Sequence, residues 1–210
     1  MESAHGIFVI ILGKDLSSIN AANEIYKEAQ RQEITVDVLV NNAGFATHGL
    51  FSEISLEEEI GEIQVNVTSL TALTKLFLRD MVERGTGKVL NIASTAAFQP
   101  GPLMAVYYAT KSFVLSFSEA LSEELKGTGI TVTALCPGPT RTGFSQRASI
   151  QNSILFKKSE DPKNVAKIGY KGLMSGKRVV IPGIINVIST NLVKFIPHKI
   201  LLGEIKKLQY

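Results

Sequence analysis

The chain has 210 residues, of which 45% are hydrophobic and 20% are charged, a balance typical of one globular domain with a sizeable core. The net charge of +3 is small, and no cluster of basic and aromatic residues indicates a nucleic-acid partner. One cysteine and three separated histidines exclude a disulfide framework and give no metal-ligand spacing. Neither a secretory signal nor a membrane-spanning run is recognised, so a cytoplasmic setting is expected.

Strand-like and helix-like segments alternate from the first residues onward. The continuously apolar run at residues 7–12 predicts a strand buried on both faces of a parallel sheet. Residues 16–32 then place apolar side chains at helical spacing. Residues 36–41 form the next predicted strand, which ends in a polar turn closed by Gly44.

The second half of the chain continues this alternation. Ser55 is expected to begin a helix, because Glu58 has the spacing of a capping box, and an irregularity is expected near Gly61. Further strands are predicted at residues 88–94, 130–138 and 178–183, and a long helix at 104–126. Asp161 and Pro162 form a capping pair that opens another helix, which runs to about residue 173. The order predicts a single α/β domain over residues 1–210 with a doubly wound parallel sheet.

Ligands of open parallel sheets bind beyond the carboxyl ends of the strands. Compact polar or turn-forming residues lie at four such ends: Asp15, Asn41 with Asn42, Ser94, and Pro137 with Gly138. We therefore expect these residues to share one crevice. Cys136, next to the last of these turns, is expected to be a buried structural thiol.

Tyr107 and Lys111 are four positions apart on the helix that follows Ser94, so both project from one face. A lysine ammonium beside a phenol lowers the pKa of the phenol, which suits a general acid/base near neutral pH. Ser94 could bind the same substrate oxygen. The alternative is that Tyr107 is a core residue and Lys111 a solvated one. Tyr108 is the rival tyrosine, but no lysine lies four positions after it.

Five short motifs occur in one order along the chain: NNAG at 41–44, VNVTS around Asn66, NIAS ending in Ser94, YYATK with Tyr107 and Lys111, and PGPTRT at 137–142. Their order and separation resemble those of the short-chain dehydrogenase/reductase family over residues 7–183. The resemblance implies a Rossmann-like fold. It also implies an oxidoreductase that transfers hydride between NAD(P), with NADP favoured, and a carbonyl or alcohol.

The resemblance assigns a catalytic tetrad to Asn66, Ser94, Tyr107 and Lys111. In the family pattern, Tyr107 would be the acid/base and Ser94 would orient the substrate oxygen. Lys111 would lower the pKa of Tyr107 and hold the nicotinamide ribose, while Asn66 would anchor a water that relays protons from Lys111. No metal ligand is implied.

Cofactor contacts are implied by the same resemblance. They are Asp15 and Leu16 at the adenine, Asn41, Ala43 and Gly44 at the adenosine ribose, Pro137, Gly138, Thr140 and Thr142 at the nicotinamide carboxamide, and Tyr107 and Lys111 themselves. Plainer alternatives are a simple turn at Asn41, a helix start at Asp15 and a solvated Thr142.

The resemblance also gives the opening run a position in the family pattern. Residues 7–12 match the family's third strand, so the first two strands and the glycine-rich pyrophosphate turn have no counterpart. We therefore expect an N-terminally truncated pattern that lacks part of the cofactor site, and a chain with this pattern could be inactive as written. The opening strand should pair beside residues 36–41, or an apolar sheet edge is left open and the chain folds poorly.

The resemblance places a variable substrate lid at residues 143–160. Phe144, Ile150 and Phe156 make it apolar, which suggests a hydrophobic substrate, although these side chains could instead pack the lid shut. The apolar tail at 184–210 could cover the core, join a dimer interface or lie on a membrane surface. The family suggests a homodimer or tetramer through the helices that begin near Ser55 and Met104. A non-catalytic scaffold of the same fold and a peripheral membrane binder are the alternative functions.

Overall fold

The computed structural model of the protein describes residues 6–151, 153–156 and 159–209, and its centre is a parallel sheet of four strands in the order β1-β2-β3-β4. The strands are β1 (Val38–Asn41), β2 (Gly87–Ile92), β3 (Ile130–Leu135) and β4 (Val179–Val180). The α-helices are α2 (Ala21–Arg31), α3 (Leu56–Ile63), α4 (Leu70–Arg84), α5 (Ala105–Glu124), α6 (Phe144–Arg147), α7 (Pro162–Met174), α8 (Ile184–Leu192) and α9 (His198–Gln209). The π-helical segment η1 (Gln64–Ser69) joins α3 to α4, and shorter 3-10 turns are η2 (Thr95–Phe98), η3 (Ile154–Phe156) and η4 (Val193–Phe195).

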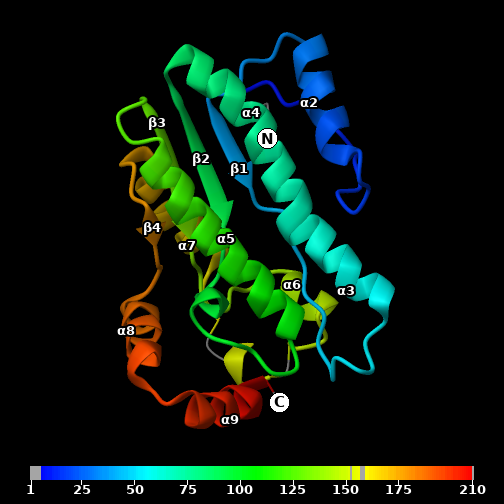
Figure 1. The fold of residues 1–210 in the computed structure, drawn as a ribbon, viewed down its shortest axis with the longest axis vertical. Coiled ribbons are helices and arrows are strands. Elements are labelled where there is room, and N and C mark those ends of the chain that lie inside the picture. Colours follow the sequence, from blue (N-terminus) through cyan, green and yellow to red (C-terminus); the bar gives the residue numbers. More distant parts are fainter. Residues whose placement is uncertain (1–5, 152, 157–158, 210) are drawn as a thin grey trace.

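Helices cover both faces of the sheet. In Figure 1, α4 and α5 cross in front of the strands and α7 lies behind them, while α2 packs beside α4. Side chains alternate along β2 accordingly: Val89 packs with Met81 of α4 on the front face, and Leu90 packs with Val165 and Leu173 of α7 on the back face. The predicted Rossmann-like α/β fold is confirmed.

Local sequence explains where two of these helices begin. The Ser55 hydroxyl accepts a hydrogen bond from the Glu58 backbone N–H at 3.2 Å and donates one to the Glu58 carboxylate at 3.0 Å. The Asp161 carboxylate accepts from the Lys163 N–H at 3.2 Å, and Pro162 occupies the first helical turn. Both predicted helix starts are therefore confirmed. The expected irregularity also exists, but it lies in η1, just after the predicted position.

The prediction of a buried strand at residues 7–12 is wrong. These residues form no strand, and the side chains of all six are exposed. The predicted pairing beside β1 is also absent, because β1 is an edge of the sheet and pairs with β2 alone within the described part of the chain. An apolar run becomes a buried strand only where it joins a sheet, and residues 7–12 are not part of the described sheet. On the back face of β1, Val38 and Val40 remain 42% and 50% exposed.

Candidate functional site

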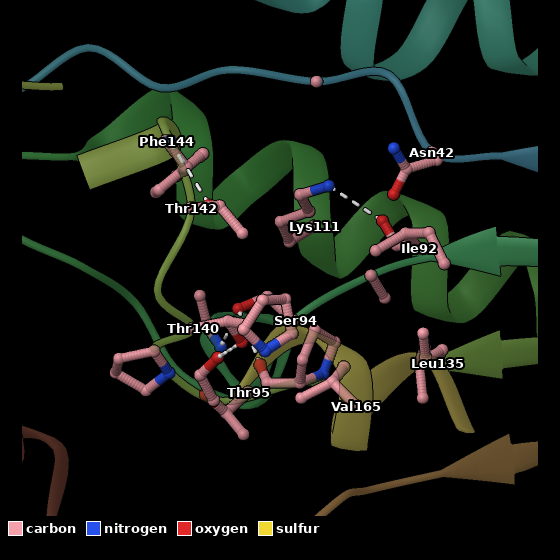
Figure 2. A pocket seen from close by; sticks show the side chains of 18 of the residues that line it. Asn42, Ile92, Ser94, Thr95, Lys111, Leu135, Thr140, Thr142, Phe144 and Val165 are labelled. Carbon is pink, nitrogen blue, oxygen red and sulfur yellow. Dashed lines mark hydrogen bonds between the residues drawn. The ribbon is translucent and has the colours of Figure 1, made fainter. Parts of the chain in front are cut away.

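A cavity of about 770 Å³ opens at the carboxyl ends of the strands, where the sequence predicted a crevice. Figure 2 shows Ser94, Lys111, Thr140 and Thr142 arranged around it. Tyr107 also lines the cavity. The sheet continues the cavity wall on the back face through Val38, Val40, Leu90 and Ile92. The predicted catalytic residues and an apolar surface of the sheet therefore line the same cavity.

Tyr107 and Lys111 are both buried and project from the same face of α5. The Lys111 Nζ lies 5.7 Å from the centre of the Tyr107 ring and donates a hydrogen bond of 2.8 Å to the carbonyl oxygen of Ile92 (Figure 2). The Tyr107 ring also packs against Phe144, with ring centres 5.2 Å apart. The alternative that Lys111 is a solvated surface residue is therefore excluded, because its side chain is buried.

Burial dominates the protonation of both groups. It raises the pKa of Tyr107 above its ordinary value, and a hydrogen bond with Ser94 opposes this shift. Burial lowers the pKa of Lys111 to about 8, against the attraction of Glu62. The expected lowering of the Tyr107 pKa is thus not found, because the loss of solvent around the phenol outweighs the hydrogen bond with Ser94 that lowers this pKa.

Ser94 follows β2 and links two strand ends. Its hydroxyl accepts a hydrogen bond from the Ala96 N–H at 3.1 Å, which caps η2, and lies 3.4 Å from the carbonyl oxygen of Pro137. The Pro137 contact links Ser94 to the loop after β3, and the hydrogen bond with Tyr107 links it to α5. The structure therefore brings together Ser94, Tyr107 and Lys111 of the predicted tetrad.

The side chain of Asn66 lies behind the cavity wall. It is buried in η1, where its Oδ1 accepts from the Phe45 N–H at 3.1 Å and its Nδ2 donates to the Phe45 carbonyl at 2.9 Å. A second donated bond of 3.1 Å reaches the Thr110 hydroxyl on α5. A Cβ at Gly44 would lie 2.9 Å from the Asn66 Oδ1, so a larger residue here would have to displace the Asn66 amide. Asn66 thus fixes the turn after β1 against α5.

The two asparagines of the NNAG motif face opposite ways. Asn41 is buried on the front of the sheet, where its amide donates to the Thr74 hydroxyl at 2.9 Å and to Asn91 Oδ1 at 2.8 Å. Asn42 lines the cavity, as does Gly44, whereas neither Asn41 nor Ala43 does. Of the three residues predicted at the adenosine ribose, Gly44 alone is part of the cavity wall, and Asn42 of the same motif lies there as well.

The remaining predicted cofactor residues divide into two groups. Pro137, Gly138, Thr140 and Thr142 line the cavity. Asp15 and Leu16 lie outside its wall: the Asp15 carboxylate accepts from the Ser17 N–H at 2.9 Å, a bond that lowers its pKa, and the Leu16 carbonyl accepts from the Ser69 hydroxyl at 2.7 Å.

The predicted lid closes part of the cavity. Phe144, Ile150 and Phe156 line it, while residues 152, 157 and 158 of the lid lie outside the described chain. Of the apolar tail, α9 covers the core, since Leu201 and Ile205 are buried in the cluster that contains Tyr107 and Tyr108. The exposed apolar residues of α8 leave the other expectations for the tail open.

Two residues of the site were missed from the sequence. Glu62 is buried four positions before Asn66 on the same helical face, a spacing that could have drawn attention to it. The Arg147 guanidinium lies 3.9 Å from the centre of the Phe45 ring, and both residues line the cavity.

Burial raises the pKa of the Cys136 thiol to about 12, as expected of a structural cysteine. Within the described ranges, no cluster of potential metal ligands occurs and no helix has the length and hydropathy needed to cross a bilayer.

A family model described as short chain dehydrogenase matches residues 2–153. The ketoacyl reductase HetN of Nostoc sp. is 32% identical over 179 residues, which make up 85% of this chain and 62% of HetN. The very-long-chain 3-oxoacyl-CoA reductase of Mus musculus is 35% identical over 181 residues, 84% of this chain and 57% of that protein. The chain thus spans less than two thirds of the length of these relatives.

Solved structures show the same likeness. A short-chain dehydrogenase from Sphingobium yanoikuyae, in complex with NADPH, matches with a TM-score of 0.81 at 29% identity, over 93% of this chain and 79% of that one. A 7β-hydroxysteroid dehydrogenase shares the fold, with a TM-score of 0.84 at 21% identity over 97% and 79% of the two chains. Because the family model covers more than half of its length, this chain belongs to the short-chain dehydrogenase/reductase family.

Proposed function

We propose that this chain carries the catalytic centre of an NAD(P)-dependent oxidoreductase that interconverts a hydrophobic carbonyl compound and its alcohol. The observation that carries the proposal is the meeting of Ser94, Tyr107 and Lys111 in one largely apolar cavity. Relatives named as ketoacyl reductases and a structural neighbour in complex with NADPH support the same activity. NADP is the favoured cofactor and NAD the alternative.

The residues present fit a nicotinamide cofactor. A cavity of about 770 Å³ is large enough for much of a dinucleotide, and the absence of a side chain at Gly44 lets the backbone line its wall. Asn42, Thr140 and Thr142 would offer hydrogen bonds, and the Lys111 ammonium would hold ribose hydroxyls. When bound, the nicotinamide supplies the hydride that a carbonyl carbon accepts or an alcohol carbon loses.

The protein's own part is to hold the substrate oxygen and move a proton. Because burial keeps the pKa of Tyr107 high, its phenol is protonated at neutral pH and suited to donate a proton to the oxygen of a carbonyl undergoing reduction. Ser94, which bonds to Tyr107, would orient the same oxygen. Asn66 would act by holding the turn that carries Gly44.

The cavity walls favour an apolar substrate. Phe144, Ile150, Phe156 and Met104 surround the side of the cavity near Tyr107. We infer an acyl- or steroid-like carbonyl compound, and the relatives named 3-oxoacyl-CoA reductases favour the 3-oxoacyl class.

The long helices α4 and α5 leave Val82 and Phe113 exposed, and we infer self-association through these helices. Light scattering after size exclusion would measure the mass of the particle and so test this inference.

The decisive experiment compares Tyr107→Phe with Tyr108→Phe. NADPH and NADH are titrated by fluorescence, and NADPH oxidation is followed with 3-oxoacyl and steroid ketones. Tyr107→Phe should lose on the order of 100-fold or more in turnover while binding NADPH as tightly as the wild type. Tyr108→Phe should retain turnover. Equal activity of wild type and Tyr107→Phe, or no cofactor binding by the folded wild type, would refute the proposal and favour a non-catalytic scaffold.

A second candidate function, peripheral membrane binding, is favoured by α8. Ile184, Ile185, Ile188 and Leu192 of this helix are exposed, and no residue of α8 is charged. Such a face can enter the interface of a bilayer. Co-sedimentation with liposomes should then fall when Ile184 and Ile185 are both replaced by serine, and equal sedimentation of both proteins would exclude it.

A further inference from the structure

Glu62 is the most deeply buried acidic group of the described chain, with 0% of its surface exposed. Its Oε2 accepts hydrogen bonds from the Thr47 N–H at 2.8 Å and from the Thr47 hydroxyl at 2.9 Å. Its Oε1 is buried with no hydrogen-bond partner among the described residues. A buried carboxyl with an unpaired oxygen is costly, so its retention calls for a physical reason.

The turn after β1 is held from one side by two residues of a single continuous helical run. Asn66 binds both backbone groups of Phe45, and Glu62, one helical turn earlier, binds Thr47. The same turn lies close to Lys111, since a Cβ built at Gly44 would be 3.6 Å from the Lys111 Nζ. Gly44 and Phe45 line the cavity. Glu62 therefore supports the wall against which a ligand and Lys111 both lie.

The charged and titratable groups that face Glu62 come from its own helix and from α5. Glu59 lies beside it, with its Oε2 3.4 Å from the Thr47 hydroxyl, and the repulsion between the two carboxylates raises the Glu62 pKa. The Lys111 ammonium attracts the Glu62 carboxylate and lowers that pKa. In return, Glu62 raises the pKa of Lys111 and that of Tyr107. Burial nevertheless dominates and brings the pKa of Glu62 to about 7.

We propose that Glu62 is a positioning residue of the catalytic site: it holds the turn from Gly44 to Thr47 beside Lys111 and provides a buried carboxylate that attracts the Lys111 side chain. The inference rests on the proposed function only in calling Lys111 a catalytic residue. The contacts that carry it belong to the chain itself. A neutral amide in place of the carboxyl would keep the hydrogen bonds to Thr47 and lose the attraction to Lys111, so the Glu62→Gln substitution separates the two parts of the proposal.

The test is an NMR titration of the Lys111 side chain in the full chain, with its signal assigned by its loss in Lys111→Met. In Glu62→Gln, the pKa of Lys111 should fall by about one pH unit, while the Thr47 amide keeps its protection from hydrogen exchange. Glu57→Gln, an exposed change on the same helix, is the matched control and should leave Lys111 unchanged. An unaltered Lys111 pKa in Glu62→Gln, or an equal change in the control, would overturn the electrostatic part.

The positional part is tested by Glu62→Leu, which removes the acceptor. Exchange of the Thr47 amide should accelerate about tenfold or more, while the amide of Val132 in β3 reports whether the fold is intact. Unchanged exchange at Thr47 would overturn the positional part. If Glu62→Leu does not fold, Thr47→Val serves instead: it removes one bond to the carboxylate, so the Glu62 pKa should rise, and an unchanged value would contradict the proposal.

An activity measurement separates this inference from the proposed function. If the wild type reduces carbonyl compounds, the basic limb of the turnover–pH profile should move to lower pH in Glu62→Gln and stay in place in Glu57→Gln. A folded wild type that binds no NADPH would refute the proposed function. The NMR titration would still decide the role of Glu62.

Discussion

The side-chain amide of Gln209 donates a hydrogen bond of 2.8 Å to the hydroxyl of Tyr108, across 101 positions of sequence. Gln209 is 2% exposed, and Leu201 and Ile205 of the same helix are buried in one cluster with Tyr107 and Tyr108. The last described helix, α9, therefore packs behind the start of α5. It fixes the residue next to the proposed acid/base without lining the cavity itself.

The first prediction concerns this bond. Gln209→Ala leaves the buried Tyr108 hydroxyl unpaired and should lower the free energy of unfolding by about 1–3 kcal/mol in urea titrations. Lys206→Ala, an exposed change on the same helix, should have little effect. In a double-mutant cycle with Tyr108→Phe the two losses should not add, and strict additivity would show that the bond does not stabilise the fold.

The second prediction separates the two asparagines at the end of β1. Asn41→Ala leaves buried polar atoms of Thr74 and Asn91 without a partner, so it should cost about 1–3 kcal/mol of stability. It should leave the NADPH dissociation constant nearly unchanged. Asn42→Ala should leave the stability nearly unchanged and weaken NADPH binding, because Asn42 lines the cavity. Stability and fluorescence titrations on both variants check this, and a loss of NADPH affinity confined to Asn41→Ala would restore Asn41 as the contact.

The third prediction concerns the close approach at Gly44. The Cβ introduced by Gly44→Ala would lie 2.9 Å from the Asn66 Oδ1 and must displace it. We expect a loss of about 1–3 kcal/mol in stability and weaker NADPH binding. Gly203→Ala in α9 is the control, because its new Cβ meets no atom within 4 Å and it should be neutral or slightly stabilising. If Gly44→Ala keeps the wild-type stability and NADPH affinity, the turn accommodates a Cβ without cost and the prediction is wrong.

The fourth prediction is a pH dependence of stability. Burial raises the pKa of Glu62 from 4.5 to about 7, so the folded chain holds this proton more tightly than the unfolded chain. The resulting stabilisation is complete below pH 4.5 and is lost as the pH rises through 7. Relative to Glu62→Gln, the wild type should therefore lose on the order of 2 kcal/mol across this interval. Urea unfolding at several pH values measures the difference, and parallel pH curves for the two proteins would contradict it.

The fold and the centre of the site could be predicted because they depend on local patterns. Strand and helix periodicity placed the four sheet strands, and the caps at Ser55 and Asp161 gave two helix starts. The spacing of Tyr107 and Lys111 fixed their common helical face, and the strand ends brought Ser94 to the same cavity. Each of these relations is set within a few residues.

The failures concern properties that depend on distant partners. Whether residues 7–12 are buried depends on strands beside them, which the run itself does not encode. The pKa of Tyr107 depends on how completely the lid and α9 exclude water, not on its spacing from Lys111. Asn41 could have been placed correctly, since side chains alternate along a strand and Asn41 continues the inward face of Leu39.

The open back face of β1 links the occupancy of the cavity to the rate at which stored protein aggregates. Val38 and Val40 belong both to the cavity wall and to an edge strand that can template pairing with another molecule. A ligand that fills the cavity covers these valines, so by mass action it disfavours pairing through this edge. Concentrated samples stored without a ligand should therefore gain thioflavin-binding aggregates faster than samples stored with one.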